Sequence, residues 1–444
     1  MLNFFKKLFK ASYVLHPLRT LLIIGVIVTS VSSNLHWGQD HWKNILEADA
    51  KGYYAYLPAI FIYQDLNFGF FDKIEKGTYY NSNLFYDYRS FAHGKIINKY
   101  FCGTAICQLP FFGIAHALSP FMGFEQDGYS QLYLVMVNVA AIFYLLLGLF
   151  FADKVLQKRR ISANARAIVL LAFTLGTNLF YYTIGECGMS HVYSFALISL
   201  FVYLLQGYVE DGKWMKLNAA LALAGLIVLV RPVNGLVVLS AVFIAGNGDV
   251  LKNRFLYALK HIGKIVPGLV VGLLFPLLQL LSYKVYYGHF VVYTYINEAF
   301  HFTLTNLNDF LISYKKGMFV YTPMLVLSLV GCFVLFKKSA FEGWSFVLFL
   351  LVVLYVLSSW WNWWYGGSFS SRVMIDYYIF FMIALASLIQ AATTKLSRRL
   401  LIGLVIAITL FTQIQTYQYR YYKIHWEEQT KDRYWREFMR IDKL

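Results

Sequence analysis

Charged residues are scarce in this sequence. They make up 14% of its 444 residues, whereas hydrophobic residues make up 59% and the mean hydropathy is +0.54. A soluble domain carries about 25% charged residues, so the composition excludes an ordinary soluble protein. Apolar runs of roughly 18 residues or more, long enough to cross a bilayer, recur along the chain. The sequence therefore predicts an all-α polytopic membrane protein, because the strands of a membrane barrel would alternate in polarity.

Cysteines and acidic residues are also few. The four cysteines form no CxxC pair and have no zinc-ligand spacing with histidine, so no metal site is predicted. A disulfide between Cys102 and Cys107 is not expected. The 39 Lys and Arg outnumber the 23 Asp and Glu, which gives a net charge of +16. These basic residues fall in short clusters between apolar runs, which is typical of membrane orientation signals, and no nucleic-acid partner is predicted.

The basic clusters predict a topology. If they are cytoplasmic, the N-terminus is cytoplasmic, residues 35–129 form a large outer loop, and a tail at 417–444 follows the membrane domain 1–416 on the outer side. The segment 104–121 is expected to be a helix on the outer face, since a span there would put residues 154–160 outside. About 11 segments are predicted, near 14–34 (an uncleaved anchor), 130–152, 164–182, 190–208, 217–231, 233–247, 265–285, 317–336, 344–361, 373–391 and 399–416.

The first outer loop carries Asp49 just before an amphipathic run at residues 52–63 that includes Tyr53 and Tyr54. The run predicts a helix in the membrane interface, with its tyrosines at headgroup depth, where they are candidates for substrate contact. A carboxylate at this boundary can accept a proton from an acceptor hydroxyl. Aspartate is also a preferred helix N-cap, so a catalytic and a capping role for Asp49 are both open.

Three basic residues of the outer loops are candidates for binding phosphate. Lys99, in "NKYFCG", precedes the expected 104–121 helix, whose free N–H groups also attract anions; an interfacial lysine is the alternative. Arg231, in "LVRPVNG", interrupts a long apolar run, which indicates either a function or a paired charge. Arg372 lies in the last outer loop, and its i, i+4 spacing from Asp376 predicts an ion pair.

Other outer-loop side chains are candidate substrate contacts. Glu186 and His191 lie at the membrane boundary in "GECGMSH", where a cap and a core histidine are the alternative. Glu298 is an isolated acid of the loop 286–316. Trp363 and Trp364 belong to a cluster of four tryptophans beside Gly-Gly, a composition that suits stacking on a sugar or a cation, although tryptophan belts are ordinary at membrane interfaces.

Together these features resemble the C-type (GT-C) superfamily of membrane glycosyltransferases, which includes protein O-mannosyltransferases and lipid A aminoarabinose transferases. Asp49 in "EADAKGYYAYLP" holds the place of the family's catalytic aspartate, and Lys99 holds that of a lysine that binds donor phosphate. The family's Lys/His-Pro-Pro element lacks its prolines here, where Tyr100 and Phe101 follow Lys99. "LVRPVNG" looks like the family's Arg-Pro element, and "WWYGGSFSSR" looks like a late-loop motif of bacterial members with unassigned substrates.

The resemblance implies a GT-C-like bundle in the inner membrane of a bacterium, with its active site on the periplasmic face. The expected reaction is an inverting transfer of a sugar from a polyprenyl-phosphate donor to the hydroxyl of an unidentified protein, lipid or glycan. Asp49 would take the acceptor proton, while Lys99, Arg231 and Arg372 stabilise the departing phosphate. No cofactor is required, and the use of a divalent metal stays open. A transporter or flippase and a non-catalytic envelope-glycan assembly protein are the alternative classes.

Overall fold

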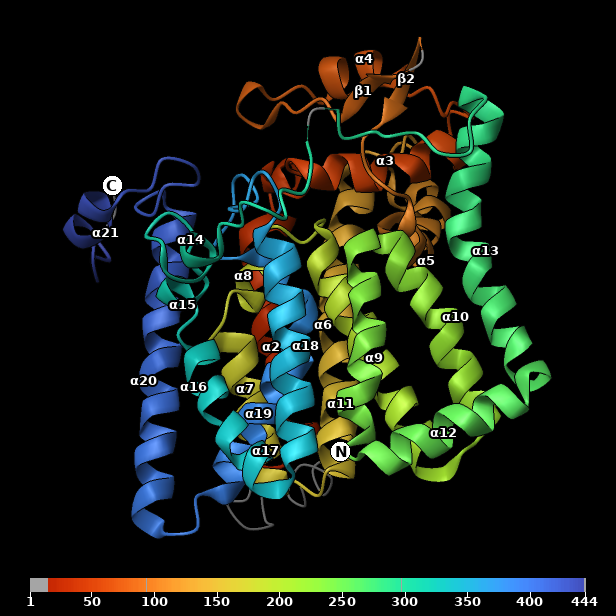
Figure 1. Cartoon of the computed structure of the whole chain (residues 1–444). Helices are drawn as coiled ribbons and strands as arrows, with labels where there is room; N and C mark the ends of the chain where they lie inside the picture. The colour runs from red at the N-terminus through yellow and green to blue at the C-terminus, as the bar shows by residue number, and fades with distance from the viewer. Residues whose placement is uncertain (1–14, 93, 297, 443–444) are drawn as a thin grey trace, which may run out of the picture.

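The computed structural model describes residues 15–92, 94–296 and 298–442, so the basic residues at 6–10 lie outside the described part. The chain is a bundle of helices that run roughly parallel to one another, with a smaller cap across one end (Figure 1). We call the capped end the α3 end, after the helix α3 (Asp49–Phe61) that lies across it. The polar residues discussed below gather there.

The bundle fits an all-α multi-pass membrane protein. In the described residues, eight helices are long and apolar enough to cross a membrane. They are Pro17–Trp37 (α2 with η1), Gly103–Met122 (α5 with η5), Gln131–Lys158 (α6), Ser190–Asp211 (α9), Ile262–Tyr287 (α13), Ala340–Ser358 (α18), Arg372–Ala391 (η7 with α19) and Lys395–Arg420 (α20). Shorter apolar helices lie at Ala163–Leu175 (α7), Trp214–Val230 (α10) and Pro232–Ala245 (η6 with α11). The predicted number of 11 membrane segments stays a prediction.

Two predicted helices are interrupted. The expected helix 164–182 is divided into α7 and α8 (Leu179–Ile184), and the expected helix 317–336 into α15 (Met318–Tyr321), α16 (Met324–Val330) and α17 (Cys332–Lys338). Pro323 and Gly331 stand at the two later breaks. A Cβ on Gly331 would lie 2.0 Å from the Ala384 carbonyl oxygen of α19. Only glycine, which has no side chain, allows the two backbones to approach this closely, and this explains the glycine at the break between α16 and α17.

Helix α5 (Gly103–Leu118) begins and ends in the same half of the bundle (Figure 1). A Cβ on Gly103 would lie 2.3 Å from the Val230 nitrogen at the end of α10. Near the other end of α5, His116 Nδ1 lies 2.6 Å from the Tyr133 hydroxyl in the first turn of α6. Although its length would allow a span, α5 therefore does not cross the bundle, in agreement with the expectation for 104–121.

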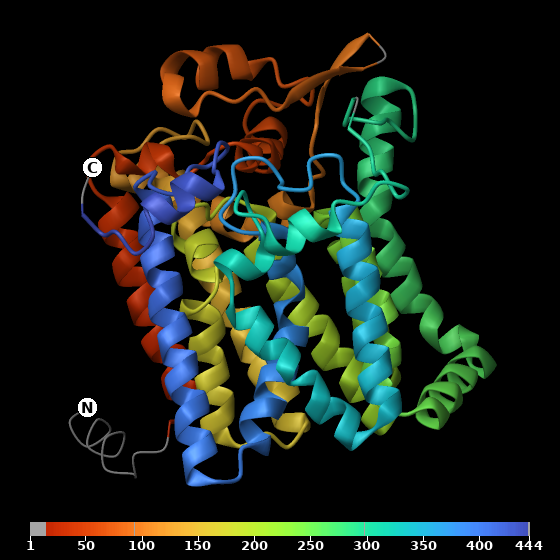
Figure 2. The same cartoon turned by 60° about the vertical axis from the view of Figure 1, so that its left-hand side comes forward.

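A small cap covers α3 (Figure 2). Its two strands pair antiparallel, with Arg89 opposite Asn98, and this hairpin was not predicted. The helix predicted over 52–63 is present as α3, but the expectation that its tyrosines lie at headgroup depth is wrong, because Tyr54 and Tyr56 are buried and pack on Phe112 and Phe68. The cap comprises α4 (Phe70–Lys73), η3 (Ile74–Thr78), η4 (Ser82–Leu84), β1 (Arg89–Ala92) and β2 (Lys95–Asn98), and η2 (His41–Asn44) precedes α3.

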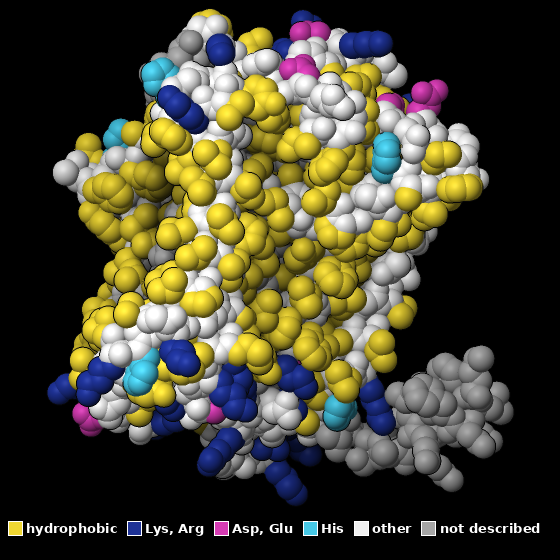
Figure 3. All heavy atoms as spheres, turned by 90° about the vertical axis from the view of Figure 1, so that its right-hand side faces the viewer, with side chains coloured by type: hydrophobic (Ala, Val, Ile, Leu, Met, Phe, Trp, Pro, Cys, Tyr) yellow, Lys and Arg dark blue, Asp and Glu magenta, His cyan; other side chains and the backbone are white. Residues whose placement is uncertain are grey.

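The outer surface separates apolar from charged residues. Figure 3 shows a broad apolar face around α13, with lysines and arginines gathered at the end opposite α3. The unpredicted helix α12 (Gly248–Lys260) lies at that basic end. At the α3 end, α21 (Lys431–Arg436) packs Tyr434 against Tyr314, which lies between α14 (Leu307–Ile312) and α15. The tail therefore folds against the loop 286–316.

Candidate functional site

A cavity of about 970 Å³ lies at the α3 end, between the beginning of α3 and the ends of α10, α18 and α20. Segments far apart in the sequence form its walls. Most of the residues singled out from the sequence line this one cavity: Asp49, Tyr53, Lys99, Glu186, His191, Arg231, Glu298 and Arg372. The fold therefore brings the segment 35–129 together with four later segments.

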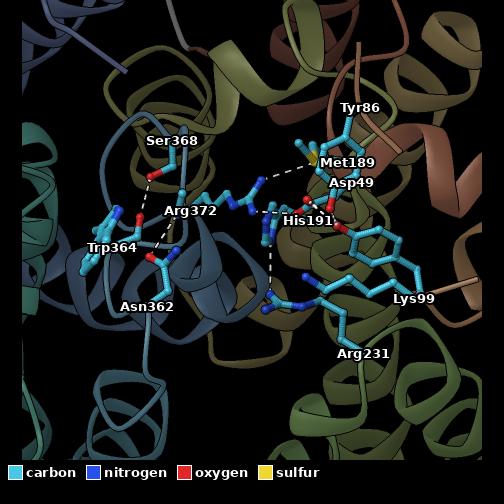
Figure 4. A network of polar contacts seen from close by, with 12 residues as sticks. Asp49, Tyr86, Lys99, Met189, His191, Arg231, Asn362, Trp364, Ser368 and Arg372 are labelled. Atoms are coloured by element: carbon cyan, nitrogen blue, oxygen red, sulfur yellow. Dashed lines mark hydrogen bonds and ion pairs between the residues drawn. The ribbon is translucent and has the colours of Figure 1, made fainter. Parts of the chain in front are cut away.

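Asp49 is the first residue of α3, and its carboxylate faces the cavity rather than the helix end. The capping interpretation is wrong, because Ala48 holds the cap position and no side chain caps the helix. Instead, the Tyr100 hydroxyl donates to Asp49 Oδ1 at 2.6 Å, and Arg372 donates to Oδ2 at 2.6 Å (Figure 4). Ala48 has a positive φ of 45°, a sparsely populated conformation that turns the chain into α3.

The surroundings of Asp49 keep it ionised. Burial by itself raises the pKa of this carboxyl, but the charge of Arg372 and the hydrogen bonds from Tyr100 and Arg372 outweigh burial, so its pKa lies below the ordinary value. The Tyr100 hydroxyl is in turn 2.5 Å from the Tyr86 hydroxyl. Neither tyrosine was predicted to belong to the site, although Tyr100 directly follows Lys99 in the sequence.

Arg231 is held by a buried carboxylate. Asp376, which is fully buried, accepts from Arg231 at 2.8 Å, from Asn234 at 2.7 Å and meets His191 Nδ1 at 2.9 Å. The predicted Arg372–Asp376 pair is therefore wrong. The two residues lie in η7 (Arg372–Tyr377), a 3₁₀ helix, in which residues three apart align and residues four apart do not.

Lys99 is also paired. Its Nζ lies 2.5 Å from Glu298 Oε1, and both side chains are about one-fifth exposed, at 21%. The Lys99 backbone N–H donates to the Tyr88 carbonyl at 2.9 Å, which fixes the chain between β2 and α5. Three of the four Lys and Arg side chains that line the cavity thus have a carboxylate partner: Lys99 with Glu298, Arg231 with Asp376, and Arg372 with Asp49. An anionic ligand would have to compete with these ion pairs.

Glu186 occupies a different part of the cavity, which we call the Glu186 pocket: Glu47, Glu186, Tyr181, Tyr419 and Arg420. Glu186 lies between α8 and α9 and is only 7% exposed. Its Oε2 atom is buried and has no hydrogen-bond partner among the described residues. Burial raises the pKa of Glu186 to about 8, against the lowering effect of Arg372. Burial likewise raises the pKa of Glu47 to about 7.

Three predicted residues lie away from the cavity. The Tyr54 hydroxyl donates to the Gly128 carbonyl. Trp363 is buried, and the Trp364 indole donates to Glu427 Oε1 at 2.9 Å while Lys315 lies over its ring at 3.6 Å. The tryptophans that line the cavity are instead Trp360, Trp361 and Trp426. The last comes from the tail, where no local pattern connects it with the site.

The arrangement is not that of a recognisable metal centre. In the described ranges of the chain, no group of three or more His, Cys, Asp or Glu side chains is placed to hold an ion. All four cysteines are free thiols. What the site offers is the ionised carboxylate of Asp49 and three cations held in ion pairs, together with a second pocket in which the pKa values of Glu47 and Glu186 are raised.

Comparison with known proteins adds no assignment. The sequence matches no model of a known protein family, and a search of curated proteins finds no similar chain. The function is therefore argued from the geometry of the cavity.

Proposed function

We propose that the protein is a glycosyltransferase that moves a sugar from a polyprenyl-phosphate donor to an acceptor hydroxyl, with inversion at the anomeric carbon. The observation that carries the proposal is the convergence of Asp49, Lys99, Arg231 and Arg372 on one cavity at the end of an apolar helix bundle. In this proposal the bundle lies in the inner membrane of a bacterium, the N-terminus is cytoplasmic, and the α3 end and the C-terminus face the periplasm.

The three cations are suited to a phosphate that gains charge as it leaves. Guanidinium and ammonium groups fixed beside a leaving phosphate stabilise the transition state without reorganising. Each cation already has a carboxylate partner, so donor binding exchanges one ion pair for another. Lys99, Arg231 and Arg372 have the geometry for this exchange because all three also line the cavity.

Asp49 is proposed as the general base. In the reaction, the acceptor oxygen forms a bond to the anomeric carbon and its proton passes to Asp49. The bond between that carbon and the phosphate oxygen breaks, and the polyprenyl phosphate leaves with the electron pair. A phosphate that draws Arg372 away from Asp49 would also remove the charge that lowers the pKa of Asp49. Donor binding would thereby make Asp49 a stronger base.

The apolar wall of the cavity suits the prenyl chain. Val230, Pro232 and Val233 line the cavity at the end of α10, and Phe300 and Trp361 line it beside the end of α18. Val230, Pro232 and Val233 adjoin Arg231 in the chain, so a lipid phosphate held there could extend its chain toward the apolar surface of the bundle. An aqueous sugar nucleotide would leave that wall without a partner.

The direct test is to supply the purified protein in lipid with polyprenyl-phosphate-linked hexoses and to measure turnover as the release of polyprenyl phosphate. Asp49→Asn should lower turnover at least about a hundredfold, the size typical of losing a general base, while donor binding persists. Asp40→Asn is the matched control, because Asp40 lies in the same loop with its side chain 82% exposed. Near-normal turnover by Asp49→Asn would remove Asp49 as base. Donor that is bound and moved across the bilayer intact would favour a flippase instead.

A further inference from the structure

The Glu186 pocket is not used by the proposed chemistry at the phosphate. It belongs to the same cavity but lies beside the ends of α8 and α20, whereas Arg231 lies beside the ends of α10 and α18. The turn that carries Glu186 packs directly on the first turn of α3, since a Cβ on Gly188 would lie 2.6 Å from Ala50 Cβ. The pocket therefore adjoins Asp49.

A buried carboxyl oxygen without a partner is costly, so its position needs an explanation. Glu186 Oε2 has no partner in the described part of the chain, and neither has the buried Nε of Arg420, which lines the same pocket. A ligand that both donates and accepts hydrogen bonds would satisfy these atoms. The Tyr181 and Tyr419 rings, whose centroids are 4.9 Å apart, provide an aromatic wall beside them.

We infer that the Glu186 pocket is the acceptor subsite and that it takes a neutral, hydroxyl-rich ligand, namely the sugar hydroxyls of a glycan acceptor. This inference rests on the proposed function, since an acceptor must reach Asp49. Each sugar hydroxyl both donates and accepts, as a protonated carboxyl does. An ammonium ligand would meet Arg372 and Arg420, and an anionic ligand would meet Glu47, whose pKa of about 7 leaves it partly ionised at neutral pH.

The ionisation of the pocket agrees with this ligand class. With a pKa raised to about 8, chiefly by burial, Glu186 is mostly protonated at neutral pH and can donate a hydrogen bond. The charged and titratable groups around it come from several elements: Arg372, Glu47, Asp49, Lys316, Tyr181, Tyr182 and Tyr419. Above about pH 8, Glu186 loses the proton that it would donate.

The inference can be tested by binding, independently of turnover. We would titrate the purified full-length protein with three probes at pH 7, a neutral methyl hexoside, glucosamine and glucuronic acid, and follow the fluorescence of the tryptophans that line the cavity. The methyl hexoside should bind most tightly. Glu186→Gln should bind it within about twofold of wild type, because the amide also donates and accepts, whereas Glu186→Leu should lose about tenfold, as expected for one lost buried hydrogen bond.

The controls separate binding from folding and from the proposed reaction. Glu125→Leu makes the same change at an exposed acid of the α3 end and should leave binding unchanged, and donor binding by Glu186→Leu should persist. Raising the pH from 7 to 9.5 should weaken hexoside binding to wild type but not to Glu186→Gln. If glucosamine bound more tightly than the methyl hexoside and Glu186→Gln lost that binding, the inference of a neutral ligand would be overturned. If Glu186→Leu bound the hexoside as tightly as wild type, the inference of an acceptor subsite would be overturned. Donor turnover that survives either result would leave the proposed function intact.

Discussion

Asp49 and Arg372 are joined by one ion pair, and the backbone before each of them is strained. Ala48 has a φ of 45°, and Ser370, two residues before Arg372, has a φ of 60°. Strain of this kind persists only where the surrounding structure imposes it, and it is common at active sites. Here it turns two distant segments so that their charged side chains meet at 2.6 Å.

Ala48 gives a direct test of that strain. Glycine adopts a positive φ without a steric cost, so Ala48→Gly should raise the free energy of unfolding by roughly 0.5–1 kcal/mol despite the added freedom of the unfolded chain. Ala48→Val should destabilise, because a β-branched residue is disfavoured at positive φ. Thermal unfolding of the two variants in the same detergent measures the difference. Equal midpoints for both would show that the turn relaxes at no cost.

Glu186 should make stability depend on pH. The ordinary pKa of 4.5 applies to the unfolded chain and a value of about 8 to the folded one, so the folded state holds this proton more tightly. Its contribution to stability is complete below about pH 4.5 and is lost as the pH rises toward about 8. Glu186→Gln carries no titrating group. Its unfolding temperature relative to wild type should therefore rise across this window and level off above it, and a constant difference would contradict the burial of a neutral acid.

At the scale of elements, the position of α5 depends on one glycine. Gly103 meets the backbone of Val230 at the end of α10, next to Arg231, and a Cβ there would come within 2.3 Å of it. Gly103→Ala should push α5 from α10, lower the free energy of unfolding by about 1–3 kcal/mol and weaken donor binding by shifting Arg231.

The same helix provides the control. Gly113 of α5 is exposed, and nothing lies within 4 Å of a Cβ built on it. Gly113→Ala should be neutral or stabilise by about 0.5–1 kcal/mol, since glycine is unfavourable inside a helix. Unfolding and donor-binding measurements on both variants separate close packing from helix propensity. A Gly103→Ala protein with unchanged donor binding would show that α5 does not position Arg231.

Helix existence was predictable from the sequence, but the environment of each helix was not. Apolar runs located α6, α9, α13 and α18 closely, because length and hydrophobicity are local properties. Tyr54 and Tyr56 were expected at a membrane interface but are buried. This burial was not predictable, because no local sequence pattern indicates the cap that covers the two tyrosines. The Arg372–Asp376 pair failed because a 3₁₀ turn replaced the assumed α-helix.

The candidate site was predictable as a set of residues but not as a set of pairs. Outer-loop polar residues such as Asp49, Lys99 and Arg231 stood out against an apolar sequence, and they do line one cavity. Their ion-pair partners lie 145 to 323 positions away in the sequence, and the Asp49–Arg372 pair has the largest separation. Such contacts depend on how the bundle closes.

At the scale of the whole molecule, charge divides the bundle into two ends. Lysines and arginines gather at the end opposite the cavity (Figure 3), and cytoplasmic loops carry such an excess in multi-pass proteins. The proposed donor and the inferred glycan acceptor both require the cavity to face outward. Both the proposed reaction and the inferred acceptor therefore depend on the orientation of the bundle in the membrane.

Cysteine labelling tests this orientation. Asn83 lines the cavity and is exposed, while Ser397 is exposed near the start of α20 at the other end of the bundle. In a parent that carries Cys102→Ala and Cys332→Ala, the two remaining native cysteines are buried. A membrane-impermeant maleimide should label Asn83→Cys in spheroplasts, whereas Ser397→Cys should react only after permeabilisation, because charged reagents do not cross the hydrocarbon core. The reverse pattern would place the cavity in the cytoplasm, where an outer-leaflet donor could not reach Asp49.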